Sequence, residues 1–529
     1  MIEVANLSYK HPGGVSLLEG VSFKVPDGYK VALVGANGTG KTTLLRLIAG
    51  EDRATSGQVR ADGRIAYMPQ LIGMMGETSK VRDLLLRLSS ASLRRAGARL
   101  QAAEASTHES QEESAHLEYA DALVAWGEAG GFDAEVLWDT CSSAALGKRL
   151  EKVSDRLLSS LSGGEQKRLA LEVLLRSEAQ MLLLDEPDNF LDIPATRWLE
   201  QVLNESTKTI LFVSHDRALL AAVATRVVTI EGHRAWTHPG SYATYHEERA
   251  RRLDRLEEEH RRFQDERDRL TAMIREFKQR SIFNDKFATK AASTEKRLER
   301  FERDNAPPEL ARPQDVKMRL QGGRTGKIAL RATALEIPGI VRPFNVELYY
   351  GERVGVVGSN GTGKSHFLRL LAGESIDHRG NWKLGARVTP GLFSQTHDHP
   401  ELADVELLEV MSKSGLRIEQ AMPALKRYEL HRVARTPFSV LSGGQQARFQ
   451  ILMLEMASPT MLLLDEPTDN LDVDSAEALE QGLAGYEGTV VTVTHDRWFM
   501  RSMDRFLVFG SDGVVQERID SPYLVDARA

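Results

Sequence analysis

Residues 35–42 read Gly-Ala-Asn-Gly-Thr-Gly-Lys-Thr, and residues 358–365 read Gly-Ser-Asn-Gly-Thr-Gly-Lys-Ser. Each segment follows a short run of small and apolar residues, at 31–34 and 354–357, that predicts a buried strand. Each also leads into a predicted helix. Strand, glycine-rich loop and helix in this order are typical of the P-loop, in which backbone N–H groups surround phosphates at a helix N-terminus. The repeated motif therefore predicts two α/β modules.

Two further stretches recur in the same order. Leu-Ser-Gly-Gly-Glu-Gln at 161–166 returns as Leu-Ser-Gly-Gly-Gln-Gln at 441–446, and Met-Leu-Leu-Leu-Asp-Glu-Pro at 181–187 returns unchanged at 461–467. Four apolar residues followed by Asp-Glu predict a buried strand that delivers two carboxylates to the P-loop edge of a parallel sheet. The chain thus contains two homologous modules.

The spacing of the repeats locates an insertion in the first module. The P-loop lysines lie 323 positions apart, but Ser162 and Ser442 lie only 280 apart. About 45 extra residues therefore fall between Gln70 and Ser162. The stretch from Leu93 to Leu146 is rich in Ala, Leu, Glu and Arg, which predicts a helical arm at about 93–146. A surface elaboration and an interaction arm both fit this pattern.

Between the modules, residues 241–320 form a charged segment with apolar residues at heptad spacing. The first series is Leu253, Leu256, Phe263, Leu270, Ile274 and Phe277, and the second is Phe287, Ala291, Leu298 and Phe301. The second series ends before Pro307 and Pro308, which stop a helix. We predict an antiparallel helical hairpin with its tip near 280–286. Its first helix, about 243–278, would be about 50 Å long.

Charge is distributed unevenly along the chain. The net charge is −7, which gives no reason to expect a nucleic-acid partner. Residues 241–320 nevertheless hold 20 basic and 17 acidic residues, and 275–300, around the predicted tip, hold eight basic and four acidic ones. A solvated coiled-coil surface and contact with a phosphate backbone are both compatible with this segment.

Composition excludes several classes of protein. The 529 residues, 42% of them hydrophobic, are typical of a multidomain globular protein. We find neither an apolar run of about 18 residues nor a secretion signal, so we expect no membrane partner and a cytoplasmic location. Cys141 is the only cysteine, which excludes internal disulfides and cysteine-ligated zinc or iron–sulfur centres.

The order and spacing of these motifs resemble the ATP-binding cassette (ABC) superfamily. Each Leu-Ser-Gly-Gly signature precedes the strand-end aspartate by 23 residues in both modules. That family also carries a glutamine after the P-loop, matched by Gln70 and Gln395, and a switch histidine, matched by His215 and His495. The resemblance covers some 450 residues, all but the hairpin and the termini.

The resemblance implies an α/β fold with two P-loop ABC ATPase domains joined by a long antiparallel α-helical hairpin linker. The expected domains are 1–240, with the arm at about 93–146, then the hairpin at 241–320, and 321–529. It also implies that ATP and Mg²⁺ bind at two composite sites, where the modules meet head to tail. ATP joins the modules and hydrolysis separates them. We expect the protein to be a monomer whose cassettes dimerise within the chain.

The implied sites combine residues from both modules. The first pairs Lys41, Asp185, Glu186 and His215 with Ser442 and Gly444; the second pairs Lys364, Asp465, Glu466 and His495 with Ser162 and Gly164. The expected catalytic residues are Glu186, Glu466, His215 and His495, and the expected Mg²⁺ ligands are Thr42, Gln70, Asp185, Ser365, Gln395 and Asp465. The expected nucleotide-binding residues are Gly35, Ala36, Asn37, Gly38, Thr39, Gly40, Lys41, Thr42, Gly358, Ser359, Asn360, Gly361, Thr362, Gly363, Lys364, Ser365, Ser162, Gly163, Gly164, Ser442, Gly443, Gly444 and Tyr9. Both sites keep the glutamate and the histidine, so we expect both to hydrolyse ATP.

The sequence departs from the family pattern in two places. The usual Asp-Glu-Pro-Thr-Asn-His-Leu-Asp reads Asp-Glu-Pro-Asp-Asn-Phe-Leu-Asp at 185–192 and Asp-Glu-Pro-Thr-Asp-Asn-Leu-Asp at 465–472. Tyr9 is expected to stack on adenine in the first module, but Leu335 stands at the matching position of the second.

The hairpin separates this chain from most cassette proteins and resembles the linker of the F subfamily. Matching segments are Gly-Ser-Tyr at 240–242, Ala-Thr-Lys-Ala-Ala at 288–292 and Arg-Leu at 297–298. Members of that subfamily bind the ribosomal tRNA exit site and point the hairpin toward the peptidyl-transferase centre. The resemblance thus implies ribosomal RNA and tRNA as partners, without DNA sequence specificity. Antibiotic protection and translation control stay open. The alternative is the ATPase subunit of a transporter with a separate permease.

Overall fold

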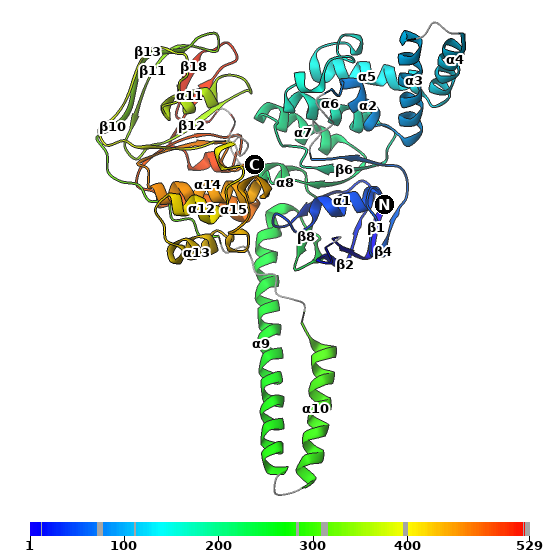
Figure 1. The fold of residues 1–529 in the computed structure, drawn as a ribbon, viewed down its shortest axis with the longest axis vertical. Helices are drawn as coiled ribbons and strands as arrows, with labels where there is room; N and C mark the ends of the chain where they lie inside the picture. The colour runs from blue at the N-terminus through cyan, green and yellow to red at the C-terminus, as the bar shows by residue number, and fades with distance from the viewer. Residues whose placement is uncertain are drawn as a thin grey trace. The chain divides into compact units, whose positions relative to one another are not determined.

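The computed structural model describes residues 1–11, 13–70, 78–109, 113–281, 285–307, 316–394, 400–521 and 523 (Figure 1). The chain divides into two compact units, Met1–Thr237 with Gln314–Ala529, and His238–Pro313. The first unit contains both α/β modules and the second contains the helical hairpin. The predicted fold class is confirmed, while the division at 240 and 320 stays a prediction.

The first module is built on a central sheet and a smaller antiparallel one. Within the described residues, the central sheet has six strands in the order β5-β6-β7-β3-β8-β9, and pairing from β5 to β8 is parallel. These strands are β3 (Lys30–Val34), β5 (Ile65–Met68), β6 (Met181–Asp185), β7 (Thr209–Val213), β8 (Arg226–Glu231) and β9 (Arg234–His238). The antiparallel sheet, β2-β1-β4, consists of β1 (Ile2–Lys10), β2 (Ser16–Val25) and β4 (Ser56–Ala61).

Strands β3 and β6 position the P-loop and Asp185 of the first module. Every residue of both strands is buried, as expected for strands that are covered on both faces. Both run in the same direction, so the P-loop after β3 and Asp185 at the end of β6 reach the same edge of the sheet. This edge carries the motifs of the first module.

Helices pack around these sheets and form the arm. They are α1 (Lys41–Ala49), α2 (Val81–Arg87), α3 (Ala91–Glu109), α4 (Glu113–Glu128), α5 (Gly131–Leu146), α6 (Gly163–Arg176), α7 (Ile193–Glu205) and α8 (Arg217–Val223), with 3₁₀ turns at Leu150–Lys152 and Leu158–Ser160. The predicted helical stretch covers α3, α4 and α5. The start of α5 needs Gly131, because a Cβ there would lie 2.1 Å from the buried Trp126 ring.

The second module repeats this plan. Its described sheets have the orders β14-β15-β16-β12-β17-β18 and β11-β10-β13. The strands are β10 (Ile328–Ile337), β11 (Val341–Tyr349), β12 (Arg353–Gly358), β13 (Arg379–Leu384), β14 (Pro390–Phe393), β15 (Met461–Asp465), β16 (Thr489–Val493), β17 (Arg505–Phe509) and β18 (Val515–Arg518). The helices are α11 (Lys364–Leu371), α12 (Leu407–Lys413), α13 (Ile418–Arg427), α14 (Gly443–Ala457) and α15 (Val473–Ala484), with 3₁₀ turns at Pro400–Leu402, His431–Val433, Phe438–Val440 and Phe499–Ser502.

Comparison of the two modules shows which helices make up the insertion in the first module. Helix α5 contacts α6 as α13 contacts α14, so α5 and α13 occupy equivalent places. Among the described helices, α3 and α4 have no such counterpart. The extra residues of the first module are therefore the α3–α4 pair, which contact one another closely (Figure 1).

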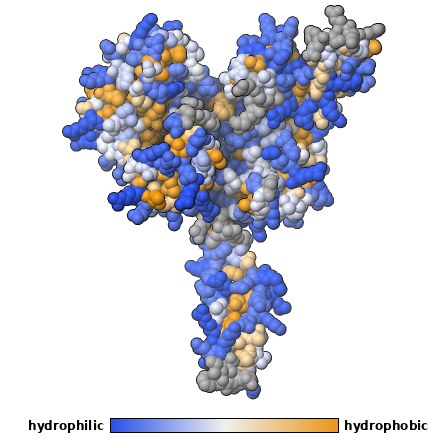
Figure 2. All heavy atoms as spheres, viewed as in Figure 1, coloured by the Kyte–Doolittle hydropathy of each residue, from blue (hydrophilic) through white to orange (hydrophobic). Residues whose placement is uncertain are grey.

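The second unit is the predicted antiparallel hairpin. Helix α9 (Tyr242–Ser281) has 40 residues, about 60 Å at about 1.5 Å per residue, and packs along α10 (Asp285–Asn305). Figure 2 shows apolar side chains gathered along the hairpin, between hydrophilic ones. The rings of Phe263 and Phe301 stack with centroids 5.0 Å apart. Of the predicted tip, 282–284 lie outside the described residues.

The described helices include no candidate for a membrane-spanning segment. In the part of the chain that the structure describes, none of them combines the length and the apolar character needed to cross a bilayer.

Cys141 provides a test of the packing beneath the arm. Its side chain on α5 is fully buried, and this burial raises the pKa of the thiol to about 11. Because the thiolate is the reactive form, we expect Cys141 to react with a disulfide reagent at least about a hundredfold more slowly in the native protein than in denaturant. The exposed Ser143 gives a control, since Cys141→Ser/Ser143→Cys should react at once in the native protein. Equal labelling rates at the two positions would contradict the described packing.

Candidate active sites between the two modules

Each P-loop is formed around its lysine. Gly35 and Gly38 take positive φ values of 152° and 81°, and α1 begins after Gly40. The Lys41 Nζ donates to the carbonyl oxygens of Gly35 at 2.7 Å and Ala36 at 3.0 Å. Lys364 makes the matching bonds to Gly358 and Ser359 at 2.8 and 2.9 Å. Both lysines are buried, and this burial lowers their pKa against the opposing effect of nearby carboxylates.

A cavity of about 330 Å³ lies over the first P-loop and is lined by both modules. The first module contributes His11, Leu17, Asn37, Gly38, Gly40, Lys41, Thr42, Thr43, Gln70, Glu186 and His215, and the second contributes Ser442, Gly443, Gly444 and Asn470. The structure therefore brings together the P-loop, Glu186 and His215 of one module with the signature of the other.

Glu186 is held by several groups of the first module. Its Oε2 accepts hydrogen bonds from Gln70 Nε2 at 2.6 Å and from Asn189 Nδ2 at 2.5 Å, and its Oε1 lies 3.6 Å from His215 Nε2. Glu186 also has a φ of 48°, a left-handed conformation that is costly for a residue with a side chain. Glu466 shares this value of φ. Such strain at the same position of both modules is typical of functional residues.

Oxygen atoms suited to a divalent cation meet at the end of β6. Neither Asp185 carboxylate oxygen has a partner of ordinary hydrogen-bond geometry among the described residues, although both are buried. Burial and then Glu186 raise the pKa of Asp185 to about 6, whereas the nearby Thr42 hydroxyl opposes this rise. Carboxylate and hydroxyl oxygens are ligands that Mg²⁺ accepts, so these residues fit the ion.

The two predicted switch histidines have pKa values below the ordinary value, which favours the neutral imidazole. Burial lowers the pKa of His215, and Lys41 lowers it further. Burial and Lys364 lower the pKa of His495 to about 3. A neutral imidazole can both donate and accept a hydrogen bond, which suits a group placed between a carboxylate and phosphate oxygens.

The second site repeats most of this arrangement. Glu466 Oε1 lies 3.3 Å from His495 Nε2, and its Oε2 accepts from the His495 backbone N–H at 2.9 Å. Burial, followed by the charge of Asp469, raises the pKa of Glu466. Gln395, the predicted counterpart of Gln70, lies outside the described residues.

The loops after β6 and β15 touch the P-loop of the opposite module. Asn37 donates from its backbone N–H to Asp472 Oδ2 at 3.0 Å and from Nδ2 to the Asn470 carbonyl at 2.9 Å. In the other direction, Asn360 Nδ2 donates to the Phe190 carbonyl at 3.2 Å. Although burial would raise the pKa of Asp472, its hydrogen bonds from Asn37 and Ser475 hold it below the ordinary value.

Both signatures begin a helix. The Ser162 hydroxyl accepts from the Glu165 N–H at 3.2 Å at the start of α6, and Ser442 caps α14 from Gln445 in the same way. The following glycines keep these helix ends open to the opposite module. A Cβ on Gly444 would lie 2.3 Å from Asn37 Nδ2, but one on Gly164 would lie 3.8 Å from Asn360 Nδ2. The first site is therefore the more tightly closed of the two.

Comparison with known proteins agrees with this geometry. A family model described as "ABC transporter" matches residues 18–189 and 341–469, and a second with the same description matches 228–319. The chain is 47% identical to an "Antibiotic resistance protein" of Mycobacteroides abscessus, covering 99% of this chain and 100% of that protein. It is 29% identical to "ABC transporter F family member 2" of Arabidopsis thaliana, over 97% and 76% of the two chains.

The chain belongs to the F subfamily of ATP-binding cassette proteins. It binds ATP and is an ATPase. A further relative is the "Tylosin resistance ATP-binding protein TlrC" of Streptomyces fradiae, which is 34% identical over 91% of this chain and 92% of that one. Among solved structures, an archaeal ribosome recycling factor in complex with a ribosomal stalk protein aligns with a TM-score of 0.58 at 20% identity, over 97% and 89% of the chains. That likeness shows the shared twin-cassette fold.

Reciprocal ion pairs join the two cassettes next to the switch histidines. Arg217 of this ABC-F chain pairs with Glu480 and, at 3.3 Å, with Asp496. Arg497 pairs with Glu200 and, at 3.5 Å, with Asp216. The Arg217 side chain is only 4% exposed, and its acidic partners raise its pKa against the effect of burial. The sequence reasoning missed these pairs, although the repeated His-Asp-Arg was a signal for them.

Two aromatic rings lie near the first ATP site. His11 lines the cavity, and its ring packs edge-on against Tyr9 with centroids 5.7 Å apart. Tyr9 is not among the described residues that line the cavity. Adenine stacking by Tyr9 stays a prediction, and His11 is a nearby ring that the sequence reasoning missed.

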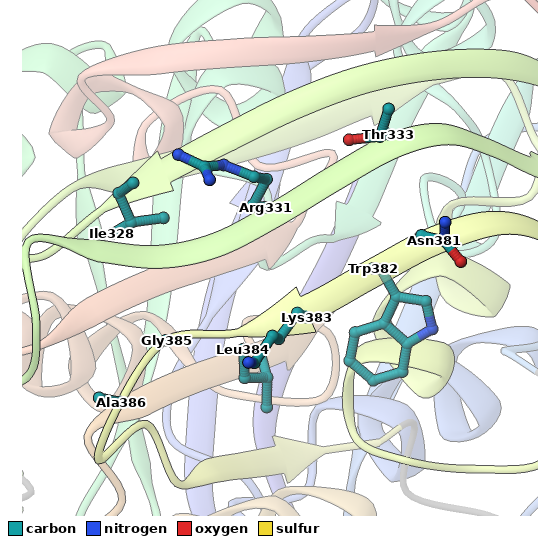
Figure 3. Close-up of a pocket in the computed structure, with 9 residues that line it drawn as sticks. All are labelled: Ile328, Arg331, Thr333, Asn381, Trp382, Lys383, Leu384, Gly385 and Ala386. Carbon is teal, nitrogen blue, oxygen red and sulfur yellow. The ribbon is translucent and has the colours of Figure 1, made fainter.

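A second cavity, of about 370 Å³, lies on the antiparallel sheet of the second cassette (Figure 3). Strands β10 and β13 line it with Arg331, Trp382 and Lys383, among others. Arg331 is engaged by Glu347 at 2.6 Å. No predicted ATP-site residue belongs to its described lining, and we assign it no role.

The ion pairs of Arg217 make a prediction about stability. Arg217→Met removes a buried cation and leaves Glu480 and Asp496 uncompensated, so we expect the free energy of unfolding of the twin-cassette unit to fall by about 3 kcal/mol. Urea denaturation measures this change. Arg64 gives a matched control, since it pairs with Glu178 at a site where the two side chains are 71% and 85% exposed, and Arg64→Met should cost less than about 1 kcal/mol. Equal costs would mean that the Arg217 pairs are no stronger than surface pairs.

Proposed function

We propose that this ATPase binds the ribosome at the tRNA exit site and protects it from antibiotics with the tip of its hairpin. Control of translation by the same binding is the other activity open to this subfamily. The resemblance of the hairpin to the F-subfamily linker supports the ribosomal target. Ribosomal RNA and tRNA would be the partners, and the cytoplasm the compartment.

The observation that carries the proposal is the similarity to a protein named for antibiotic resistance. That similarity runs through 99% of this chain and 100% of the relative, and therefore includes the hairpin and the arm as well as the cassettes. The tylosin resistance relative, with 34% identity over 91% of this chain, points the same way. Resistance is thus favoured over translation control.

The two composite sites supply the ATPase cycle. Glu186 and Glu466 would accept the proton of the attacking water, and His215 and His495, which lie beside these glutamates, would contact the γ-phosphate. Lys41 and Lys364 neutralise the β- and γ-phosphate oxygens. The signature serines and glycines, residues 162–164 and 442–444, complete the opposite site at a helix N-terminus.

The oxygen atoms of the first site fit a magnesium ion, and we propose the equivalent residues for the second. Thr42, Gln70 and Asp185 would hold it in the first site, and Ser365, Gln395 and Asp465 in the second. When bound, Mg²⁺ neutralises charge on the β- and γ-phosphates. Thr42 and Ser365 lie on the P-loop helices, and Asp185 and Asp465 lie at the ends of β6 and β15.

ATP binding would hold the cassettes together within one monomeric chain. The loop contacts between Asn37 and Asp472 and between Asn360 and Phe190 support this closed form. The hairpin is stiffened by its apolar seam, and Lys278 and Arg280 near its end pair with Glu295 and Glu276. Lys290 is exposed, with its Nζ 5.4 Å from the centroid of the Phe287 ring, and would contact a phosphate backbone. Hydrolysis would then release the protein from the ribosome.

Blocking hydrolysis should trap the protein on ribosomes. Glu186→Gln combined with Glu466→Gln keeps the size and hydrogen bonding of both side chains but removes the proton acceptors. We expect ATP binding to persist, turnover to fall by about a hundredfold or more, and the variant to co-sediment with ribosomes when ATP is present.

The exposed Glu178→Gln is the matched control and should release normally. Turnover like that of the wild type in the double variant would contradict the proton-acceptor roles. Co-purification of the double variant with a membrane permease, without ribosomes, would favour the transporter alternative.

The hairpin should be needed for resistance but not for ATP binding. We expect deletion of residues 263–297 to leave nucleotide affinity within about threefold, because the ATP sites lie in the other compact unit, and to abolish protection. Antibiotic susceptibility of cells with and without the gene measures protection.

Charge at the hairpin end can be tested with an intact fold. Lys286→Gln, Lys290→Gln and Lys296→Gln together should weaken ribosome binding by at least about tenfold, because cationic contacts to phosphates are lost. The control changes Arg251, Arg255 and Arg262, nearer the base of α9, to Gln. Equal effects of the two triple variants would argue against a specific role of the tip.

A further inference from the structure

The turns that follow the two glutamates differ at three positions, 188–190 and 468–470, and the middle position bears on the glutamate itself. Three residues after Glu186 the first cassette has Asn189, whereas three residues after Glu466 the second has Asp469. The backbone turn is the same in both, since the N–H of Asn189 approaches the Glu186 carbonyl at 3.4 Å and that of Asp469 approaches the Glu466 carbonyl at 3.2 Å. The difference is therefore confined to the side chain.

In the first site this side chain holds the glutamate. Asn189 Nδ2 donates to Glu186 Oε2 at 2.5 Å, on the oxygen that also accepts from Gln70. Two neutral donors thus fix one carboxylate oxygen and leave Oε1 toward His215. A carboxylate fixed in this way stays oriented for the proton of a water molecule.

The second site has no amide at this place. No hydrogen bond joins the Asp469 and Glu466 side chains among the described residues. Burial, followed by the charge of Asp465, raises the pKa of Asp469 to about 7, and its ionised form has acceptor atoms only, so that form cannot donate to Glu466 as Asn189 donates to Glu186. Glu466 Oε2 instead accepts from the backbone N–H of His495 at 2.9 Å. The orientation of Glu466 is therefore tied to the switch loop rather than to its own turn.

The surroundings of the two turns differ as well. The first site also contains an extra, partly buried carboxyl group, Asp188, but Lys167 lies on α6 close by and donates to the Glu186 carbonyl at 2.8 Å. The matching residues of the second cassette are Thr468 and Ala447. Lys167 therefore lies near Asp188 in the first site. In the second site, α14 has no lysine at the matching position near Asp469.

We propose that Asn189 is a positioning residue for Glu186 and that Asp469 denies Glu466 the same support, so that the first site hydrolyses ATP faster than the second. This inference rests on the proton-acceptor role proposed above for the two glutamates. In each turnover the water oxygen forms a bond to the γ-phosphorus. The bond between the γ-phosphorus and the β–γ bridging oxygen breaks at the same time. The water proton passes to the glutamate, and ADP and phosphate leave. The slower second site then determines how long the cassettes stay closed.

Single-site variants separate the two rates. In the full-length chain, Glu186→Gln leaves only the second site able to turn over, and Glu466→Gln leaves only the first. Adding Asp469→Asn to Glu186→Gln should raise kcat by about tenfold, the usual value of one well-placed hydrogen bond in a transition state, with KM for ATP changed less than twofold. Adding Asn189→Asp to Glu466→Gln should lower kcat by about tenfold.

Controls separate positioning from charge and from folding. Asp377→Asn in the Glu186→Gln background makes the same change of net charge at an exposed site and should leave kcat unchanged. Asn189→Ala removes the donor without adding charge and should lower kcat less than Asn189→Asp. If a variant at Asn189 loses ATP binding, Asn189→Ser is measured in its place. We expect Asn189→Ser to lower kcat at unchanged KM.

A second measurement does not depend on turnover rate. After a single round of hydrolysis and rapid gel filtration, the wild type should retain about one ATP per chain, and Asp469→Asn alone should retain almost none. No change in kcat and no change in retained ATP with Asp469→Asn would overturn the inference. Wild-type turnover in the double Gln variant would instead overturn the proposed glutamate roles, so the two failures are distinguishable.

Discussion

The structure depends on the contact between each P-loop and the loop that follows the Asp-Glu strand of the other cassette. Asn37 is bound by Asp472 and Asn470, and Asn360 by the Phe190 carbonyl. Each P-loop is therefore held by a hydrogen-bonding partner from the other cassette. The parallel strands contribute to this contact by presenting the carboxylates at one edge of the sheet, and the glycines contribute by letting the signatures approach closely.

Much of the fold could be predicted because its decisive motifs are local in sequence. A P-loop needs a strand, a turn and a helix within about 20 residues, and the hairpin shows its seam through heptad spacing. The 280-residue offset between matching motifs then aligned the cassettes and exposed the insertion. Its limits needed the structure, because only the contacts of α5 and α13 show that α3 and α4 are the added pair.

The parts that could not be predicted depend on side chains from distant segments. Arg217 and Glu480 are 263 positions apart, and no periodicity links them. His11 precedes the P-loop by many residues and reaches the first site only through the course of the antiparallel sheet. Asp469 was visible as a departure from the family pattern, which Asn189 keeps, but the effect of this position on a glutamate appears only when the Asn189 donor at 2.5 Å is seen.

Covalent fusion of the cassettes has an evolutionary consequence. In a homodimer every substitution appears in both copies, so a change that weakens one ATP site weakens its twin equally. In this chain the halves are encoded separately and always meet in a ratio of one to one. Selection can therefore keep one ATP site fast while the other becomes slow and sets the duration of the closed state. The cell does not have to prevent mismatched pairs of subunits.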